Sequence, residues 1–81
     1  MTRIKTIQNK PTLKEMQEFV GGYIEVVWLN DDQVMIIDEE GKVKNKPVNA
    51  EATIMATRNK AIFNNDWIAG DALIMSKEYL D

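Results

Sequence analysis

The residues that could do chemistry in this 81-residue chain are mainly carboxylates and lysines, because the sequence has neither histidine nor cysteine. These absences remove the commonest general base, the commonest transition-metal ligand and every thiolate. Ser76 is the sole serine, and without histidine it cannot belong to a serine–histidine nucleophile pair. Only lysine-based and paired-carboxylate mechanisms stay open in principle.

Two pairs of carboxylates could act as general acid and general base: Glu25 with Asp71, and Asp31 with Asp32. Neighbouring acids in a turn more often cap backbone amides or carry solvated charge. Of the functions considered, catalysis is therefore the one that these residues support least. We predict a protein that is not an enzyme and uses no cofactor.

Two further segments have the composition of ligand-binding loops but lack their spacing. Gly21-Gly22 is not followed by the lysine and hydroxyl residue of a phosphate-binding loop, so we interpret it as the end of a helix. The acidic turn at residues 38–41 lacks the alternating ligands of a calcium-binding loop. We therefore predict no metal site.

The element that ends at Gly21-Gly22 is predicted to be an amphipathic helix. Thr12 and Glu15 have the spacing of a capping box, in which each side chain accepts a hydrogen bond from a free backbone N–H. Apolar residues then recur at three- and four-residue steps on one face: Leu13, Met16, Phe19 and Val20. A helix this short must be held by packing against other elements.

A β-hairpin is predicted over residues 23–38, with Asn30-Asp31-Asp32 as its turn. Alternation places Ile24, Val26 and Trp28 on one face, and Tyr23, Glu25, Val27 and Leu29 on the other. In the second strand, Val34 and Ile36 oppose Met35 and Ile37. Both faces are therefore largely apolar, and a single layer of helix can cover only one of them.

The remaining segments add short elements around this hairpin. Residues 1–10 form an edge strand or a tail, and their alternation favours the strand. Residues 42–46 alternate lysine with other residues and predict a short third strand, while residues 61–63 predict another. Asn49 is predicted to cap a helix over Ala50–Arg58. Residues 67–75 predict a final buried strand, interrupted at Gly70-Asp71, and residues 76–81 a loosely held tail.

The expected fold is α+β, a small antiparallel sheet with two short helices in the order β-α-β-β-(β)-α-β, forming one domain over residues 1–81. With a net charge of -3, the chain lacks the basic footprint of a nucleic-acid-binding domain, which argues against nucleic acid as a partner. No segment is apolar enough to span a bilayer, and the first ten residues lack a signal-peptide core. We expect a cytoplasmic protein without membrane partners.

Four runs in order, VGGYIEVV, DEEGK, KPVN and IAGDALIM, resemble domain of unknown function 3846, a family of small proteins of phages and mobile elements. The resemblance covers Leu13 to Met75 and is most specific at residues 21–25 and at Gly70-Asp71. It implies a compact α+β fold and a phage or mobile-element protein that acts in the host cytoplasm during infection. It implies no particular activity.

The first functional hypothesis is a non-enzymatic protein-binding module. An apolar sheet face that the helices leave uncovered would join a second copy, giving a homo-oligomer, or a host protein. That face carries Tyr23, Val27, Leu29, Met35 and Ile37. Glu25 lies on it too, and either pairs with Lys44 at the sheet rim or supplies an acceptor on an otherwise apolar surface.

The second hypothesis is a small-ligand binder that sequesters a nucleotide signal used in host defence. Its polar groups would converge at a subunit junction, with aromatic and basic side chains stacking the base and holding the phosphates. These groups are Glu25, Lys44, Asn49, Arg58 and Asp71.

Overall fold

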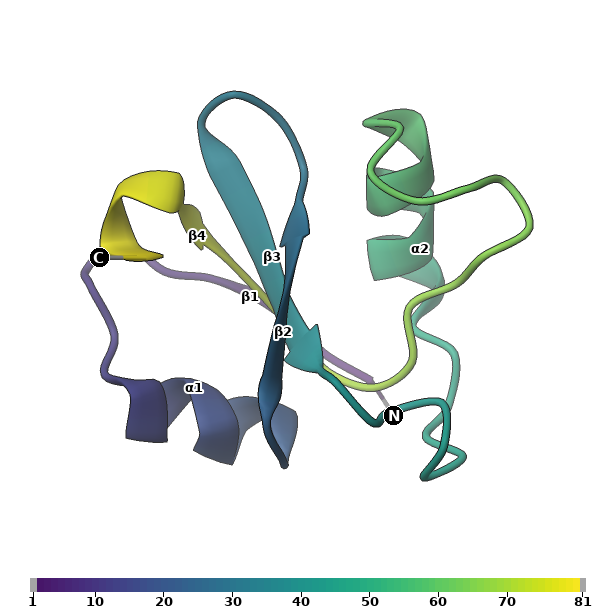
Figure 1. The fold of residues 1–81 in the computed structure, drawn as a ribbon, viewed down its shortest axis with the longest axis horizontal. Helices are drawn as coiled ribbons and strands as arrows, with labels where there is room; N and C mark the ends of the chain where they lie inside the picture. Colours follow the sequence, from purple (N-terminus) through teal and green to yellow (C-terminus); the bar gives the residue numbers. More distant parts are fainter. Residues whose placement is uncertain (1, 81) are drawn as a thin grey trace.

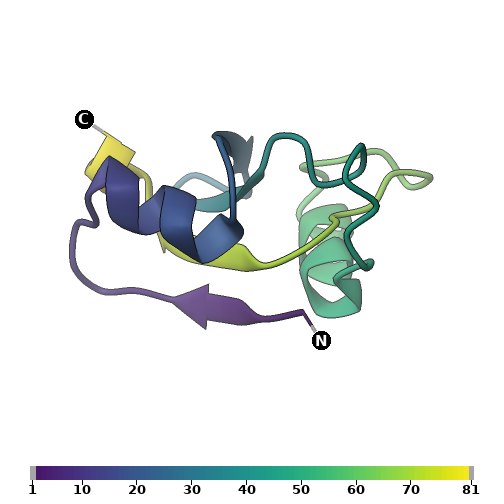
Figure 2. The same ribbon diagram turned by 90° about the horizontal axis from the view of Figure 1, so that it is seen from below.

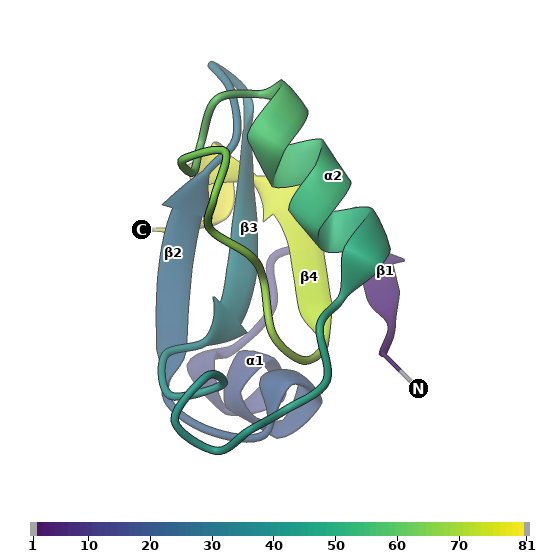
Figure 3. The ribbon, with the colours of Figure 1, turned by 90° about the vertical axis from the view of Figure 1, so that its right-hand side faces the viewer.

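A computed structural model describes residues 2–80 of the chain, and its centre is a four-stranded sheet. The strands are β1 (Ile4–Thr6), β2 (Ile24–Trp28), β3 (Gln33–Asp38) and β4 (Ala72–Ser76). They lie side by side in the order β1-β4-β3-β2, so that β1 and β2 form the two edges (Figure 3).

Two helices lie on opposite sides of the sheet (Figures 1 and 2). These are α1 (Leu13–Val20) and α2 (Ala50–Arg58), and a short 3-10 helix, η1 (Lys77–Leu80), follows β4. The predicted α+β class and the bounds of both helices are confirmed.

The ends of α1 follow directly from its sequence. The Thr12 side chain accepts from the Glu15 amide at 3.0 Å, and the Glu15 carboxylate accepts from the Thr12 amide at 2.8 Å. At the other end Gly21 has φ of 83°, a left-handed conformation that costs glycine little. The predicted capping box and glycine stop are therefore both present.

The sheet is mixed rather than purely antiparallel. β2, β3 and β4 pair antiparallel, but β1 runs parallel to β4, with Ile4 opposite Ala72. Only strands joined by a tight hairpin are obliged to be antiparallel, and β1 meets β4 from the far end of the chain.

Both faces of the sheet are buried, and the predicted alternation of side chains is confirmed. On the α2 side the core contains Val27, Leu29, Met35, Ile37 and Ile74 with Ala52 and Ala56 of α2. On the α1 side it contains Val34, Ile36, Leu73 and Met75 with Met16 and Val20 of α1. Ala52 and Ala56 are the fully buried residues through which α2 joins this core.

Two predicted short strands are wrong. Residues 42–46 form turns, because the Lys44 amide donates to Glu40 O and the Lys46 amide to Gly41 O instead of pairing with a strand. Residues 61–62 form a bend that follows the left-handed Lys60, whose φ is 57°, and Phe63 has no regular structure. Short alternation in a polar segment was too weak a signal in both places.

The predicted loose tail is also wrong over its described part. Ser76 completes β4, and Tyr79 and Leu80 pack against the core on the α1 side. The Tyr79 hydroxyl donates to Gln8 O at 2.6 Å, which ties the tail to the segment after β1. Asp81, like the first residue of the predicted domain, lies outside the described residues.

Candidate functional site

The edge of the sheet at β2 presents main-chain groups that bond no neighbouring strand. At one end the Glu39 amide donates to Tyr23 O at 2.9 Å, and at the other the Leu29 amide donates to Gln33 O at 3.1 Å. Bonded pairs alternate along an antiparallel ladder, so the odd-numbered residues of 23–29 bond β3. The even-numbered residues then direct their N–H and C=O groups away from the sheet.

These outward residues are Ile24, Val26 and Trp28. Among residues 2–80 no strand pairs with that side of β2. A row of exposed donors and acceptors is a template for another extended segment.

A groove of about 400 Å³ runs beside this edge on the α2 side. Its walls are residues 25–28 of the strand and residues 60–63 with Asp66 of the following loop. Trp28 and Phe63 are 58% and 83% exposed. Exposed aromatic side chains beside a hollow are typical of protein interfaces.

A second hollow of about 310 Å³ continues the first, since Glu25, Val27, Ile62 and Asp66 line both. We call the two together the β2 groove. Lys42 lies 4.4 Å from the ring centre of Trp67 and forms an ion pair with Asp66. The hydrogen bonds from Lys42 and from the Trp67 amide lower the pKa of the Asp66 carboxyl. Trp67 is thereby held at the rim of the groove.

The α1 side of the same edge is hollowed as well. A space of about 490 Å³ is bounded by residues 10–13 and Met16 at the start of α1, by Ile24 of β2, and by Tyr79 and Leu80 of η1. Leu13, which the helix pattern placed on the apolar face, is 55% exposed here. Both sides of the β2 edge therefore offer apolar surface to an added strand.

Asp38, at the end of β3, is a buried carboxylate held by two lysines. Its Oδ2 lies 2.9 Å from Lys44 Nζ and 2.7 Å from Lys46 Nζ, and its Oδ1 accepts from the Glu40 amide at 2.9 Å. Burial alone would raise the pKa of Asp38, but the hydrogen bonds from Lys46 and Lys44 outweigh it and lower the pKa to about 2.

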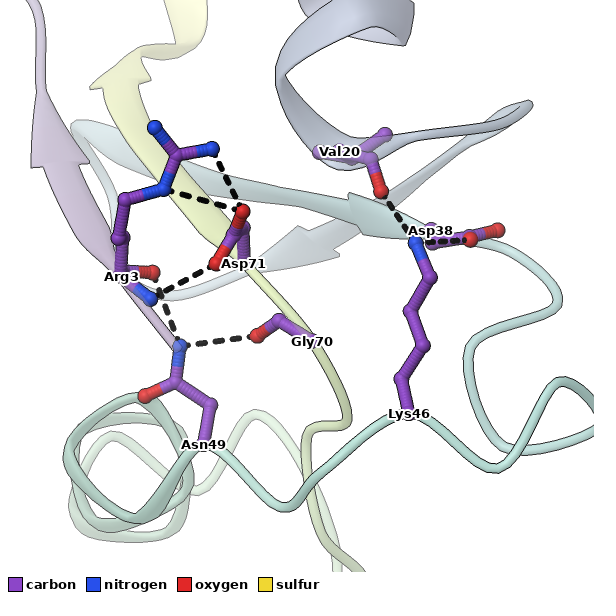
Figure 4. Close-up of polar contacts among 7 residues, drawn as sticks. All are labelled: Arg3, Val20, Asp38, Lys46, Asn49, Gly70 and Asp71. Carbon is purple, nitrogen blue, oxygen red and sulfur yellow. Dashed lines mark hydrogen bonds and ion pairs between the residues drawn. The ribbon is translucent and has the colours of Figure 1, made fainter. Parts of the chain in front are cut away.

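The same lysines reach the end of α1. Lys46 Nζ donates to Val20 O at 2.6 Å (Figure 4), and Lys44 Nζ donates to Gly21 O at 3.1 Å. Carbonyls at a helix C-terminus have no partner within the helix and attract positive charge. The cluster therefore joins α1, β3 and the 39–46 turn, and its charges are satisfied internally.

A second polar cluster fixes β1 (Figure 4). Arg3 donates to the Asp71 carboxylate through Nε at 3.1 Å and Nη2 at 2.7 Å, and its amide donates to the same carboxylate at 2.8 Å. Burial would raise the pKa of Asp71, but these bonds from Arg3 lower it. The Asn49 amide group donates to Arg3 O at 3.0 Å and to Gly70 O at 2.9 Å.

The predicted apolar binding face is not available in this chain. Val27, Leu29, Met35 and Ile37 lie beneath α2, and only Tyr23 of that set is exposed, at 69%. The prediction is wrong because the 48–69 segment returns over this face. The accessible part of β2 is its edge.

The five predicted ligand groups do not converge. Lys44 bonds Asp38 and not Glu25, so the predicted rim pair is wrong. Asn49, 2% exposed, and Asp71 both bond Arg3. Glu25 lies in the β2 groove. Arg58 ends α2 and lines no described hollow with the others.

Sequence patterns did not single out four residues of these sites: Arg3, Asp38, Lys46 and Phe63. For Asp38 a signal existed, since an acid that ends an apolar strand and precedes a lysine run suggests a buried ion pair. Phe63 stands in a polar loop, and an isolated aromatic there is itself a signal of an exposed contact.

Chemical alternatives find little support in the arrangement. Over residues 2–80 no group of three or more acidic side chains is placed to hold a metal ion. In the same span no helix has the length and apolar character needed to cross a membrane.

The chain belongs to the family described as Domain of unknown function (DUF3846), whose model matches residues 1–79. No curated protein and no solved structure shows a significant match to it.

Proposed function

We propose that the protein is a non-enzymatic binding module that adds an extended strand of another polypeptide to the edge at β2. The observation that carries this proposal is the row of outward main-chain groups at Ile24, Val26 and Trp28, with hollows on both sides. The class of function is the one expected from the sequence. The proposed binding surface differs from the expected one, because the apolar sheet face is buried beneath α2 and the edge at β2 is accessible.

Strand addition suits this surface for a physical reason. The side chains of an added strand point alternately to the two sides of a sheet. Those on the α2 side would enter the β2 groove, and those on the α1 side would cover Leu13 and Ile24. Main-chain bonds then supply affinity and the hollows supply selectivity.

The setting of this function is also part of the proposal. The family resemblance supports a phage or mobile-element protein that acts in the cytoplasm of a bacterial host. The partner would be a host protein or a second copy of the chain. The mixed-charge surface favours a polypeptide over nucleic acid.

The alternative, sequestration of a nucleotide signal, has weaker support. Three of its five polar residues form hydrogen bonds within the chain: Lys44, Asn49 and Asp71. Calorimetry against a panel of cyclic nucleotides, with Arg58→Ala as comparison, separates the two proposals.

A photocrosslinking experiment tests strand addition. Phe63 is replaced in the full chain by benzoylphenylalanine, expressed in bacteria and irradiated. The expected result is a covalent adduct to a polypeptide, because the exposed Phe63 borders the β2 groove. Mass spectrometry then identifies the captured chain.

The matched control places the same photoreactive residue at Glu51, which is exposed in the first turn of α2, outside the residues that line the β2 groove. Equal capture from both positions, or none from position 63, would contradict the proposal.

A further inference from the structure

We infer that the strand added at this edge is β2 of a second copy, placed antiparallel about a two-fold axis at Val26. The two four-stranded sheets then become one continuous sheet. This inference rests on the proposed function and names its partner.

The register follows from which groups face outward. Only Ile24, Val26 and Trp28 offer main-chain bonds on this side, so they must pair with one another across the axis. Val26 then pairs with Val26 of the second copy, and Ile24 pairs with Trp28. Each bonded pair of an antiparallel ladder exchanges both of its bonds, so about six main-chain hydrogen bonds form.

The neighbouring registers are worse. Each of them uses fewer of the outward residues. The one that pairs Ile24 with Val26 also sets Glu25 directly opposite Glu25 of the second copy, and like charges in that position repel. The axis at Val26 instead places Glu25 beside the apolar Val27 of the other chain.

Charge complementarity favours a second copy over an unrelated strand. Glu25 and Lys60 line the same groove of one chain. Because the two strands run in opposite directions, Glu25 of each copy would face the part of the groove where Lys60 of the other copy lies. The interface thus gains two opposite-charge contacts from one acidic and one basic residue.

Apolar complementarity points the same way. Trp28 is 58% exposed and would cover Ile24 of the second copy on the α1 side. An aromatic side chain opposite a β-branched one is a favourable cross-strand pair. Leu13 and Phe63, exposed in the single chain, line the hollows on either side of this pair.

Sedimentation equilibrium of the full chain tests the inference, with wild type compared to Val26→Pro. We expect a dimer for wild type. Proline removes an outward donor that bonds no other group of residues 2–80, so folding by circular dichroism is kept while dimer affinity falls about 30-fold or more.

Thr6→Pro is the matched control at the opposite edge. The Ala72 amide donates to Arg3 O and the Ile7 amide to Ile74 O, so the alternate residue Thr6 faces away from β4. This variant should dimerise as wild type does.

A charge exchange keeps the test valid even if Val26→Pro fails to fold. Glu25→Lys should weaken the dimer about tenfold, because two like charges then meet in each groove. Adding Lys60→Glu should restore it. A double variant that remains as weak as Glu25→Lys overturns the register.

A wild-type chain that stays monomeric overturns the self-pairing. If position 63 then captures a different polypeptide, the proposed strand addition stands and only its partner changes. If the monomer yields no adduct, both proposals fail.

Discussion

The two edges of the sheet are built in opposite ways. β1 has three residues, includes the exposed Lys5, and is held by side-chain bonds from Asp71 and Asn49. β2 has five residues, carries Glu25 as its one charge, and is held by the hairpin ladder to β3.

This difference shows where the protein tolerates a partner. Brevity and charge protect an edge from unwanted pairing. β1 has both, whereas β2 is longer, has Glu25 as its one charge and is bordered by exposed aromatic residues. Substitution of the side chains that hold β1 should therefore loosen β1 and leave β2 in place. Substitution of Asp38 should instead loosen the start of β2 and leave β1 in place.

The largest effect is expected from Asn49→Ala, which removes the cap of α2 and the donors to Arg3 O and Gly70 O. The buried Gly70 carbonyl and Ala52 amide lose their bonds to this side chain, while the Arg3 carbonyl keeps its bond from the Ala72 amide. The free energy of unfolding should therefore fall by about 2–3 kcal/mol. Hydrogen exchange should quicken at the Ile7 amide of the β1 side more than at the Leu29 amide of the hairpin.

The control for this variant is Asn59→Ala at the other end of α2. The Asn59 side chain makes a single exposed bond to Met55 O. Its loss should cost about 0.5 kcal/mol or less. Equal exchange at both amides in Asn49→Ala would show that the edges are not held independently.

A smaller effect concerns Asp38, which pairs with Ile24 at the start of β2. Its pKa in the folded chain, about 2, is below the ordinary value of 3.8. The charged carboxylate therefore stabilises the fold fully at a pH above 3.8. This stabilisation, about 2 kcal/mol, should be lost as the pH falls from about 4 to about 2. Thermal unfolding across this pH range measures it.

Asp38→Asn should flatten that part of the pH profile and lower the stability at neutral pH by a similar amount. Glu39→Gln, a change at the adjacent exposed residue, should leave the profile as it is. If the profile of Asp38→Asn is as steep as that of wild type, the role given to the two lysines is contradicted.

The smallest effect is expected from Arg3→Ala at the β1 edge. Its paired bonds to Asp71 are geometrically good, but the side chain is exposed, so their loss should cost about 0.5–1 kcal/mol. Urea denaturation compares this variant with Lys5→Ala, which removes a neighbouring charge. The difference measures the ion pair together with the contact of the Arg3 guanidinium, 4.5 Å from the ring centre of Phe19. A larger loss of stability for Lys5→Ala than for Arg3→Ala would contradict the role given to Arg3 at this edge.

Local signals predicted the elements whose causes are local. The capping box at Thr12, the stop at Gly21 and the cap at Asn49 each act within one turn, and both helices were found with their bounds. The hairpin was found because its period of two and its polar turn are adjacent in sequence. The short strands expected at 42–46 and 61–63 failed because alternation over so few residues also occurs in turns.

Local pattern alone determined two helices, one hairpin, a chain whose strands are apolar on both faces, and a residue inventory poor in catalytic groups. Tertiary structure decided which surfaces remain accessible. The parallel pairing of β1 with β4 and the placing of α2 over Val27 and Met35 depend on contacts between segments far apart in sequence. Those contacts bury the apolar face and leave β2 at an edge, because long-range packing, and not the period of a strand, selects its neighbours.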